Sequence, residues 1–505
     1  MTVTSKNDDL NSSHSNSNLS VDKDVFETII IGAGFSGIGM AINLKKFKQE
    51  DFIIFERNSG IGGTWWANTY PGCACDVPSN VYSFSFEPNS TWSKTFSPQD
   101  EIQQYLYQCA VKYSIIDKIK INTEVISAVW DDQMANWVIR TNFNKTYYSR
   151  FLIAASGALS EPTIPNIKGL SKFNGQYFHS ANWNHDINLK NKKVAVVGTG
   201  ASAIQFAPEI VDDTKELRVF MRTAPWILPR RDRKVTYLEQ IIFKKVPALQ
   251  LLVRAVVFWA RESYLLAFTK NKRLMKIAEK LAKRHLNSQI KNDEVKSALL
   301  PNYEMGCKRI LLSNNFYSIF NRENVKLVTS GIKEFSETTI VCEDGEQFDA
   351  DVVIFGTGFN VVEMPVAKYI MGTDGSSLSE LWQGSPRALY GTTIQNFPNL
   401  FLLMGPNTGL GHNSMVYMIE SQINYVIQAM KELTKKHKTY LVPKAEAVRR
   451  FTDSMDSQSQ NTVWVSGCVS WYLDKQGRNP TLWPDFSWKF RSQTRSINAK
   501  DYIFK

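Results

Sequence analysis

The sequence reads Val25-Phe-Glu-Thr-Ile-Ile-Ile-Gly-Ala-Gly-Phe-Ser-Gly37 at the end of a polar N-terminal segment. The β-branched run over 25–31 predicts a strand, and the apolar spacing through Met40, Ile42 and Leu44 predicts a helix after it. The glycines between them have the G-x-G-x-x-G spacing of a turn that binds a dinucleotide, in which the backbone approaches a pyrophosphate at a helix N-terminus. We therefore expect cofactor contacts from Gly32, Gly34, Phe35, Ser36 and Gly37.

A carboxylate stands at the position that such a unit requires. The apolar run over 52–55 predicts a second strand, which ends at Glu56, 24 positions after Gly32. A carboxylate at this place accepts hydrogen bonds from ribose hydroxyls. Strand, turn, helix and acid together indicate a dinucleotide site far more strongly than the glycines alone.

The same pattern recurs in the middle of the chain. A strand predicted over 193–197 leads into Gly198-Thr-Gly-Ala-Ser-Ala203, and a further strand over 217–221 ends at Arg222, again 24 positions after the first glycine. A guanidinium pairs with a 2′-phosphate, which a carboxylate would repel. The first unit therefore suits FAD and the second NADPH, although Arg222 could also be an ordinary surface cation. The expected contacts of the second unit are Gly198, Thr199, Gly200, Ala201, Ser202, Gln205, Arg222 and Thr223.

Two dinucleotide sites in one chain favour an enzyme that passes hydride from a nicotinamide to a flavin. The fold class is α/β, with two Rossmann-like domains, for FAD and NADP, and a helical insertion in the NADP domain. We expect a disordered tail over 1–23, an FAD-binding domain over 24–157 and 356–505, an NADP-binding domain over 158–235 and 301–355, and the insertion over 236–300.

Composition limits the class of protein. With 43% hydrophobic and 21% charged residues, the chain is globular, and no apolar run is long enough to span a membrane. Six cysteines among 505 residues exclude a disulfide-stapled secreted scaffold and favour a reducing, cytoplasmic location.

Other motifs resemble a known family. Gly62-Gly63-Thr64-Trp65, Tyr70-Pro71-Gly72 and Asp76 are similar to the FAD-contacting stretch of class B flavin monooxygenases. Phe173-x-Gly175-xxx-His179-xxx-Trp183 closely resembles the fingerprint of type I Baeyer–Villiger monooxygenases, although Asn184 stands where the family has Pro or Asp. Ala74 departs from the arginine of many relatives. The resemblance extends over about 26–485.

The resemblance implies a reaction. NADPH would reduce FAD, O₂ would add to the reduced flavin, and the resulting peroxide would attack a small lipophilic ketone to give an ester or lactone. Arg309 matches the family's active-site arginine, Asp76 the carboxylate that orients it, and Lys308 a residue that helps to hold the 2′-phosphate. Trp471 resembles a tryptophan that folds over bound NADP. The resemblance also implies further FAD contacts, at Gly63, Thr64, Trp65, Tyr82, Val125 and Met415.

Several alternatives stay open. The chain could oxygenate N or S heteroatoms, or bind both nucleotides without turnover as a redox sensor. His179 could be an acid/base group or a link between hinge and cofactor, and we favour the link. Cys73 and Cys75 lack further ligands nearby, so we expect packing and no metal. His412 is a weaker candidate for a substrate contact.

The net charge of +11 is concentrated in one segment. Residues 230–296 hold 17 Lys and Arg against six Asp and Glu, and the rest of the chain is balanced at 42 of each. No nucleic-acid motif accompanies this charge. Because 248–260 is apolar except for Gln250 and Arg254, the insertion could rest on an anionic membrane. The alternative is a set of helices with solvated polar faces over a buried apolar stripe.

Overall fold

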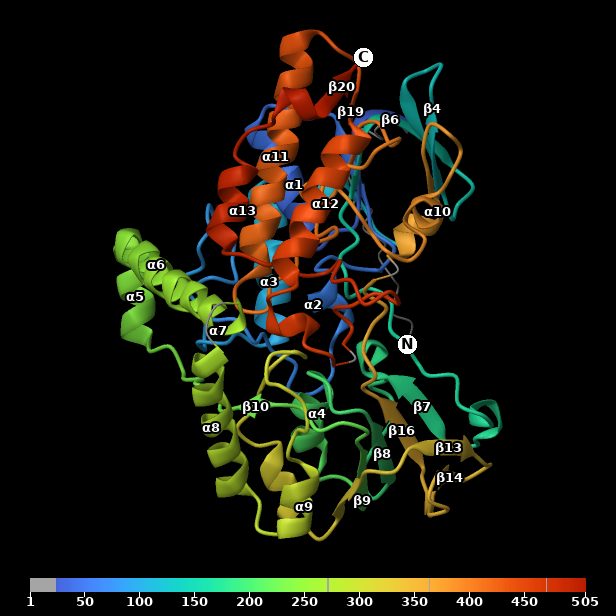
Figure 1. Cartoon of the computed structure of the whole chain (residues 1–505), viewed down its shortest axis with the longest axis vertical. Coiled ribbons are helices and arrows are strands. Elements are labelled where there is room, and N and C mark those ends of the chain that lie inside the picture. Colours follow the sequence, from blue (N-terminus) through green and yellow to red (C-terminus); the bar gives the residue numbers. More distant parts are fainter. Residues whose placement is uncertain (1–23, 270–271, 363, 469) are drawn as a thin grey trace, which may run out of the picture.

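The computed structural model describes residues 24–269, 272–362, 364–468 and 470–505, so the tail predicted for 1–23 lies outside the described residues. Two bodies, each built on a mainly parallel sheet, lie one above the other in Figure 1. The sheet of the first body has the order β17-β4-β5-β6-β1-β2-β3, with β18 also paired to β6. Its strands are β1 (Val25–Ile31), β2 (Phe52–Phe55), β3 (Ile119–Lys120), β4 (Val125–Asp131), β5 (Asn136–Thr141), β6 (Thr146–Ala154), β17 (Ile370–Met371) and β18 (Leu400–Leu402).

The strand β1 lies in the middle of this sheet because its isoleucines are buried on both faces. Ile30 belongs to one apolar core and Ile29 to another, since successive side chains point to opposite faces. The predicted bounds of β1 and β2 are confirmed to the residue. Helices cover the sheet: α1 (Phe35–Lys46), α2 (Thr64–Ala67), α3 (Gln99–Lys112), α10 (Leu378–Trp382), α11 (Met415–Lys436), α12 (Ala445–Ser459) and α13 (Ser487–Gln493). The strands β19 (Leu441–Pro443) and β20 (Tyr502–Phe504), which are distant in sequence, form a separate antiparallel pair.

The second body has a five-stranded parallel sheet of order β12-β9-β8-β16-β7. The predicted bounds of its strand β8 are confirmed, whereas β9 begins and ends one residue earlier than predicted. A separate three-stranded sheet of β13, β14 and β15 is formed by the chain between β12 and β16. The elements are β7 (Gln176–His179), β8 (Lys193–Val197), α4 (Ala203–Ile210), β9 (Glu216–Phe220), β12 (Val325–Val328), β13 (Ile332–Phe335), β14 (Thr339–Cys342), β15 (Gln347–Asp349) and β16 (Val352–Phe355).

The predicted helical insertion is present. It leaves and rejoins the second body where β10 (Ile227–Leu228) pairs with β11 (Leu311–Leu312). Its helices are α5 (Tyr237–Lys245), α6 (Pro247–Ser263), α7 (Leu265–Thr269), α8 (Lys272–Gln289) and α9 (Asp293–Ala298). Figure 1 shows α5 and α6 projecting from one side of the molecule. Within the described residues, no helix is both long enough and apolar enough to cross a membrane.

The helix α6 corrects one expectation about the insertion. We considered polar faces turned to solvent over a buried apolar stripe, but Gln250 and Glu262 are buried while Leu252 and Val256 are exposed. This alternative is therefore wrong for α6. The helix α8 follows it in part, with Met275 buried.

Candidate active site

A cavity of about 1840 Å³ lies between the two bodies and is lined by both glycine-rich turns. Gly32 and Gly198 hold equivalent places, with φ of +102° and +103°. A Cβ at Gly32 would lie 2.8 Å from the Ala155 carbonyl oxygen, and one at Gly198 would lie 2.7 Å from the Gly356 carbonyl oxygen. Only glycine combines this conformation with so close an approach to the neighbouring strand. Each turn therefore packs closely against the end of a neighbouring strand.

The first turn faces a second bare stretch of backbone. A Cβ at Gly63 would lie 2.9 Å from the Cα of Gly34, so these two glycines pass each other without side chains. The helix α1 begins here, and no side chain caps its first N–H groups. Gly34, Phe35 and Ser36 all line the cavity. Bare amides at a helix N-terminus suit a pyrophosphate.

Glu56 is buried at the end of β2 and is held by backbone and side-chain donors. One carboxylate oxygen accepts a hydrogen bond from the Ala33 amide at 2.7 Å. The other accepts from the backbone N–H of Asn58 at 2.9 Å and from its Nδ2 at 2.8 Å. These bonds fix the carboxylate beside the glycine turn, on the cavity wall. Asn58 was not predicted from the sequence, although its position two residues after Glu56 is a usable signal.

Aromatic side chains pack next to the first turn. Phe35 lies edge-on to Tyr82, with ring centroids 5.1 Å apart. The indole N–H of Trp65 donates to the Tyr82 hydroxyl at 3.1 Å. Burial raises the pKa of Tyr82, so the hydroxyl stays protonated. The predicted FAD contacts Gly63, Thr64, Trp65, Tyr82, Val125 and Met415 all line the cavity.

Two cations of the second body, Arg222 and Lys308, both line the cavity. Arg222 follows β9, and Lys308 comes from the segment after the insertion. Burial lowers the pKa of Lys308, and the positive charge of Arg222 lowers it further. A bound dianion would offset this repulsion. Gly198, Thr199, Gly200, Ala201, Ser202, Gln205 and Thr223 also line the cavity.

Gln205 joins the two bodies. Its side-chain oxygen accepts from the Tyr70 hydroxyl at 2.9 Å, and its Nε2 donates to the Ala74 carbonyl at 3.1 Å. The predicted NADP contact thus also holds the loop that leads to Asp76.

Arg309 and Asp76 meet in the cavity although 233 residues separate them. The Nη2 atom of Arg309 donates to Oδ2 of Asp76 at 3.1 Å. Burial acts to lower the pKa of Arg309, but the Asp76 carboxylate raises it on balance. The guanidinium is therefore a permanent, oriented cation.

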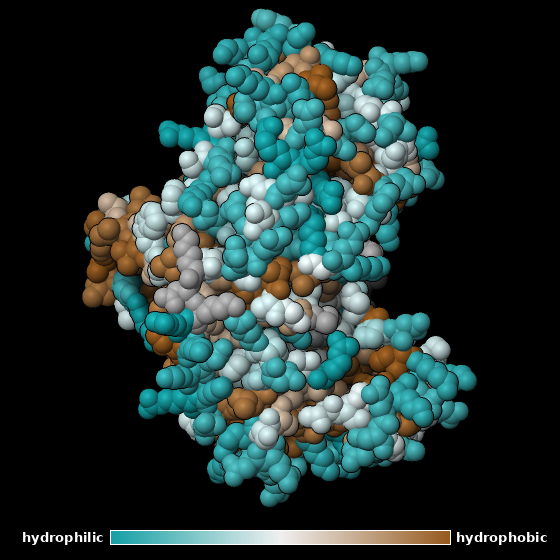
Figure 2. All heavy atoms as spheres, viewed as in Figure 1, coloured by the Kyte–Doolittle hydropathy of each residue, from teal (hydrophilic) through white to brown (hydrophobic). Residues whose placement is uncertain are grey.

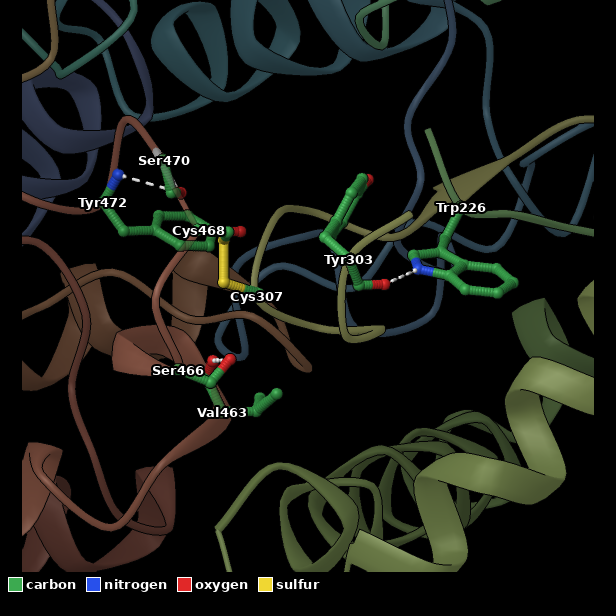
Figure 3. The surroundings of a disulfide bond; sticks show 8 residues. All are labelled: Trp226, Tyr303, Cys307, Val463, Ser466, Cys468, Ser470 and Tyr472. Atoms are coloured by element: carbon green, nitrogen blue, oxygen red, sulfur yellow. Dashed lines mark hydrogen bonds between the residues drawn. A yellow bond between two sulfur atoms is a disulfide. The ribbon is translucent and has the colours of Figure 1, made fainter. Parts of the chain in front are cut away.

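A disulfide lies beside this pair. Cys307 bonds to Cys468 across 161 residues (Figure 3). Because Arg309 lies two residues after Cys307 and Trp471 three residues after Cys468, the bond ties their two segments together. Trp471 is exposed, lines the cavity, and contacts Tyr472 in a tilted arrangement with ring centroids 4.3 Å apart. Nothing in the local sequence indicated this bond, and the reducing, cytoplasmic location stays a prediction.

The fingerprint residues do not line the cavity. Phe173 packs edge-on against Phe335 at 5.6 Å, and a Cβ at Gly175 would lie 2.7 Å from the Asp351 carbonyl oxygen. Trp183 packs between Phe178 and Phe206.

His179 is buried, and its Nδ1 accepts from the Ala181 amide at 3.1 Å. Burial lowers its pKa to about 4, against the opposing effect of the Gly358 backbone. A neutral imidazole at physiological pH favours a structural link over proton transfer. Asn184 caps a turn through the Asp186 amide at 3.0 Å, a bond that Asp would also accept.

The remaining candidates are buried. Burial raises the thiol pKa of both Cys73 and Cys75 to about 12, which fits packing and not reactivity. Among the residues described, no group of three or more His, Cys, Asp or Glu could hold a metal ion.

Glu262, near the end of α6, is a residue that sequence reasoning missed. It accepts from His412 Nε2 at 3.1 Å, Asn413 Nδ2 at 2.7 Å, and both the amide and hydroxyl of Ser487 at 3.0 and 2.7 Å. His412, which we considered as a substrate contact, therefore uses its Nε2 atom in the contact that anchors the insertion.

Comparison with known proteins gives concordant results. The family model for flavin-binding monooxygenase-like proteins matches residues 26–371. A Baeyer–Villiger monooxygenase of Pseudomonas aeruginosa is 45% identical, with 94% of this chain and 90% of the relative covered. One of Streptomyces coelicolor is 42% identical, with 94% and 91% covered.

Solved structures agree with these relatives. A closed crystal structure of cyclohexanone monooxygenase superposes with a TM-score of 0.87 at 25% identity and covers 96% of this chain and 99% of that one. Oxidised steroid monooxygenase bound to NADP gives 0.86 at 27% identity and covers 95% and 99%.

Proposed function

Because the chain belongs to the flavin-binding monooxygenase-like family, it is a monooxygenase that uses FAD and NADPH, and we propose that Arg309 and Asp76 serve its Baeyer–Villiger oxidation of a lipophilic ketone. The product would be an ester or lactone that carries one oxygen atom from O₂. The oriented Arg309–Asp76 pair in the cavity is the observation that supports this assignment of residues.

The residues present fit both cofactors. The bare backbone at Gly34 and Gly63 and the fixed Glu56 carboxylate would hold the pyrophosphate and ribose of FAD. Arg222 and Lys308 would hold the 2′-phosphate of NADPH, which relieves their repulsion. Bound together, the cofactors supply the electrons that activate O₂. The domain division stays the one expected from sequence, with the pairing of β18 to β6 as support for a discontinuous FAD-binding domain.

Arg309 would act on the ketone. Attack on a ketone carbonyl develops negative charge on its oxygen, and a preorganised cation in the cavity stabilises that charge. Asp76 holds the guanidinium at 3.1 Å, so it would act as a positioning residue. The neutral, buried His179 would transfer no proton and would instead fix the connection between β7 and the 180–183 turn.

The heteroatom alternative loses its main support. Asn184, the residue at which the fingerprint departs from the family's Pro or Asp, left room for this alternative, and it caps a surface turn in a way that Asp would reproduce. The redox-sensor alternative is disfavoured by the pairing of Arg309 with Asp76 at the cavity, since binding alone does not require it.

The experiment compares Arg309→Ala with Arg387→Ala, which removes an exposed arginine outside the cavity lining. Both proteins should keep FAD absorbance, and both should still be reduced by NADPH. With a ketone panel, Arg309→Ala should lose ester formation by about 100-fold or more, the effect of removing one oxyanion-stabilising group. Ester formation at the rate of the Arg387→Ala protein would refute the role of Arg309.

A further inference from the structure

The helix α6 lies on the surface but turns polar side chains inward and large apolar side chains outward. Its inward side carries polar side chains as well as Phe258, which stacks on Tyr417. Gln250, 4% exposed, donates to the Asn89 carbonyl at 2.6 Å. Arg254 donates to the Asn80 carbonyl at 2.8 Å and to the Ser83 hydroxyl and carbonyl at 3.0 Å each. A helix on a water-facing surface normally places such residues outward. These bonds therefore lock α6 in the opposite orientation.

The outward face of α6 is a continuous apolar stripe. Leu249, Leu252, Val256 and Trp259 follow helical spacing, so they share one face, and the last three are 60, 62 and 57% exposed. Figure 2 shows hydrophobic residues gathered on the lobe that Figure 1 labels α5 and α6. We call this the α5–α6 patch; its members are Tyr237, Leu238, Val246, Leu249, Leu251, Leu252, Val256 and Trp259.

Exposed lysines surround the patch in sequence. Lys244 and Lys245 end α5 directly before Val246, Lys234 precedes α5, and α8 adds Lys276 and Lys280. This region holds the whole net charge of the chain, +11 over 230–296. Aromatic residues such as Tyr237 and Trp259 are typical of the boundary between lipid and water.

We infer that the α5–α6 patch docks on the surface of an anionic lipid bilayer. An apolar helical face with basic flanks is the arrangement of interfacial helices, in which the apolar side chains enter the membrane and the cations contact anionic headgroups. A second copy of the chain is the less favourable occupant, because a symmetric contact would bring two segments of charge +11 together.

The patch leads toward the cavity. Tyr264, directly after α6, lines the cavity and is exposed, as are Leu274, Ile277 and Leu281 of α8. If the proposed ketone oxidation holds, a lipophilic substrate dissolved in the bilayer would have an apolar route to the site. Docking itself does not depend on that reaction.

The test is flotation of the FAD-loaded full-length protein with vesicles of phosphatidylcholine containing 30% phosphatidylserine, and with phosphatidylcholine alone. The test variant is Leu252→Ser/Val256→Ser/Trp259→Ser. The matched control is Phe143→Ser, because Phe143 is 66% exposed in the turn between β5 and β6. A Lys244→Glu/Lys245→Glu variant tests the charge.

Wild type and Phe143→Ser should float with anionic vesicles and much less with neutral ones. The triple variant and the charge variant should each lose at least tenfold in partitioning, while flavin content and the oxidation rate of a water-soluble ketone match wild type. Equal partitioning of the triple variant and wild type, or no binding of wild type to anionic vesicles, would overturn the proposal. A wild-type dimer that the triple substitution converts to monomer without vesicles would overturn it in favour of self-association.

Discussion

Replacing Arg222 with alanine should weaken binding of NADPH and leave NADH almost unchanged. Arg222 and Lys308 face the same part of the cavity, and the charge of Arg222 lowers the pKa of Lys308. A charge-assisted hydrogen bond contributes about 1.5–3 kcal/mol. Because Arg222 is exposed, the lower end applies, and about 1.5 kcal/mol corresponds to roughly a tenfold rise in KM for NADPH.

The remaining cation limits this loss. Without Arg222 the pKa of Lys308 should rise, since one of the two effects that lower it is removed. Lys308 would then hold the 2′-phosphate alone, and the double variant Arg222→Ala/Lys308→Ala should lose the preference for NADPH altogether.

The assay is steady-state oxidation of NADPH and of NADH at a saturating ketone concentration. The control is Arg322→Ala, which removes an exposed arginine of the same body that pairs with Asp212 away from the cavity. If the KM for NADPH in Arg222→Ala stayed within twofold of the control, or if both nucleotides weakened equally, the assignment of the 2′-phosphate site would be wrong.

Three further predictions concern Glu262, His179 and the disulfide. Glu262→Leu should lower the free energy of unfolding by about 3–5 kcal/mol, because its buried polar partners lose their acceptor. Denaturant titration measures this change, and a free energy of unfolding equal to that of wild type would contradict the anchor role. Burial lowers the pKa of His179 to about 4, so protonation favours the unfolded chain, and stability should fall by up to about 3 kcal/mol as the pH drops from 6.5 to 4. His179→Gln should flatten that pH dependence, and an unchanged slope of stability against pH would show that His179 is not its source. Cys468→Ser should raise the KM for NADPH several-fold while flavin content stays constant, because Trp471 is no longer tied to the Arg309 loop; equal KM values in oxidised wild type and the variant would count against this tether.

Local pattern accounts for what the sequence predicted well. The bounds of β1, β2 and β8 follow from β-branched runs that stop at a glycine or a charged residue, and these signals lie within a few residues. The equal spacing of Glu56 and Arg222 from their first glycines placed both at the cavity for the same reason.

Contacts between distant residues could not be predicted in this way. Glu262 meets His412 and Ser487 across 150 and 225 residues, and neither end of these contacts has a distinctive neighbourhood. The pairing of Arg309 with Asp76 was expected only from the family resemblance. For α6, two polar residues in an apolar run predict an amphipathic helix but not which face turns inward. The carbonyls at Asn80, Ser83 and Asn89 determine that direction.

The central claim is that the chain inserts one oxygen atom of O₂ beside a ketone carbonyl. The direct measurement is mass spectrometry of the product formed from NADPH and a ketone under ¹⁸O₂. The account predicts an ester or lactone heavier by one ¹⁸O atom, in an amount that matches the NADPH consumed. Consumption of NADPH that yields hydrogen peroxide alone across the ketone panel, or a product without the label, would contradict it.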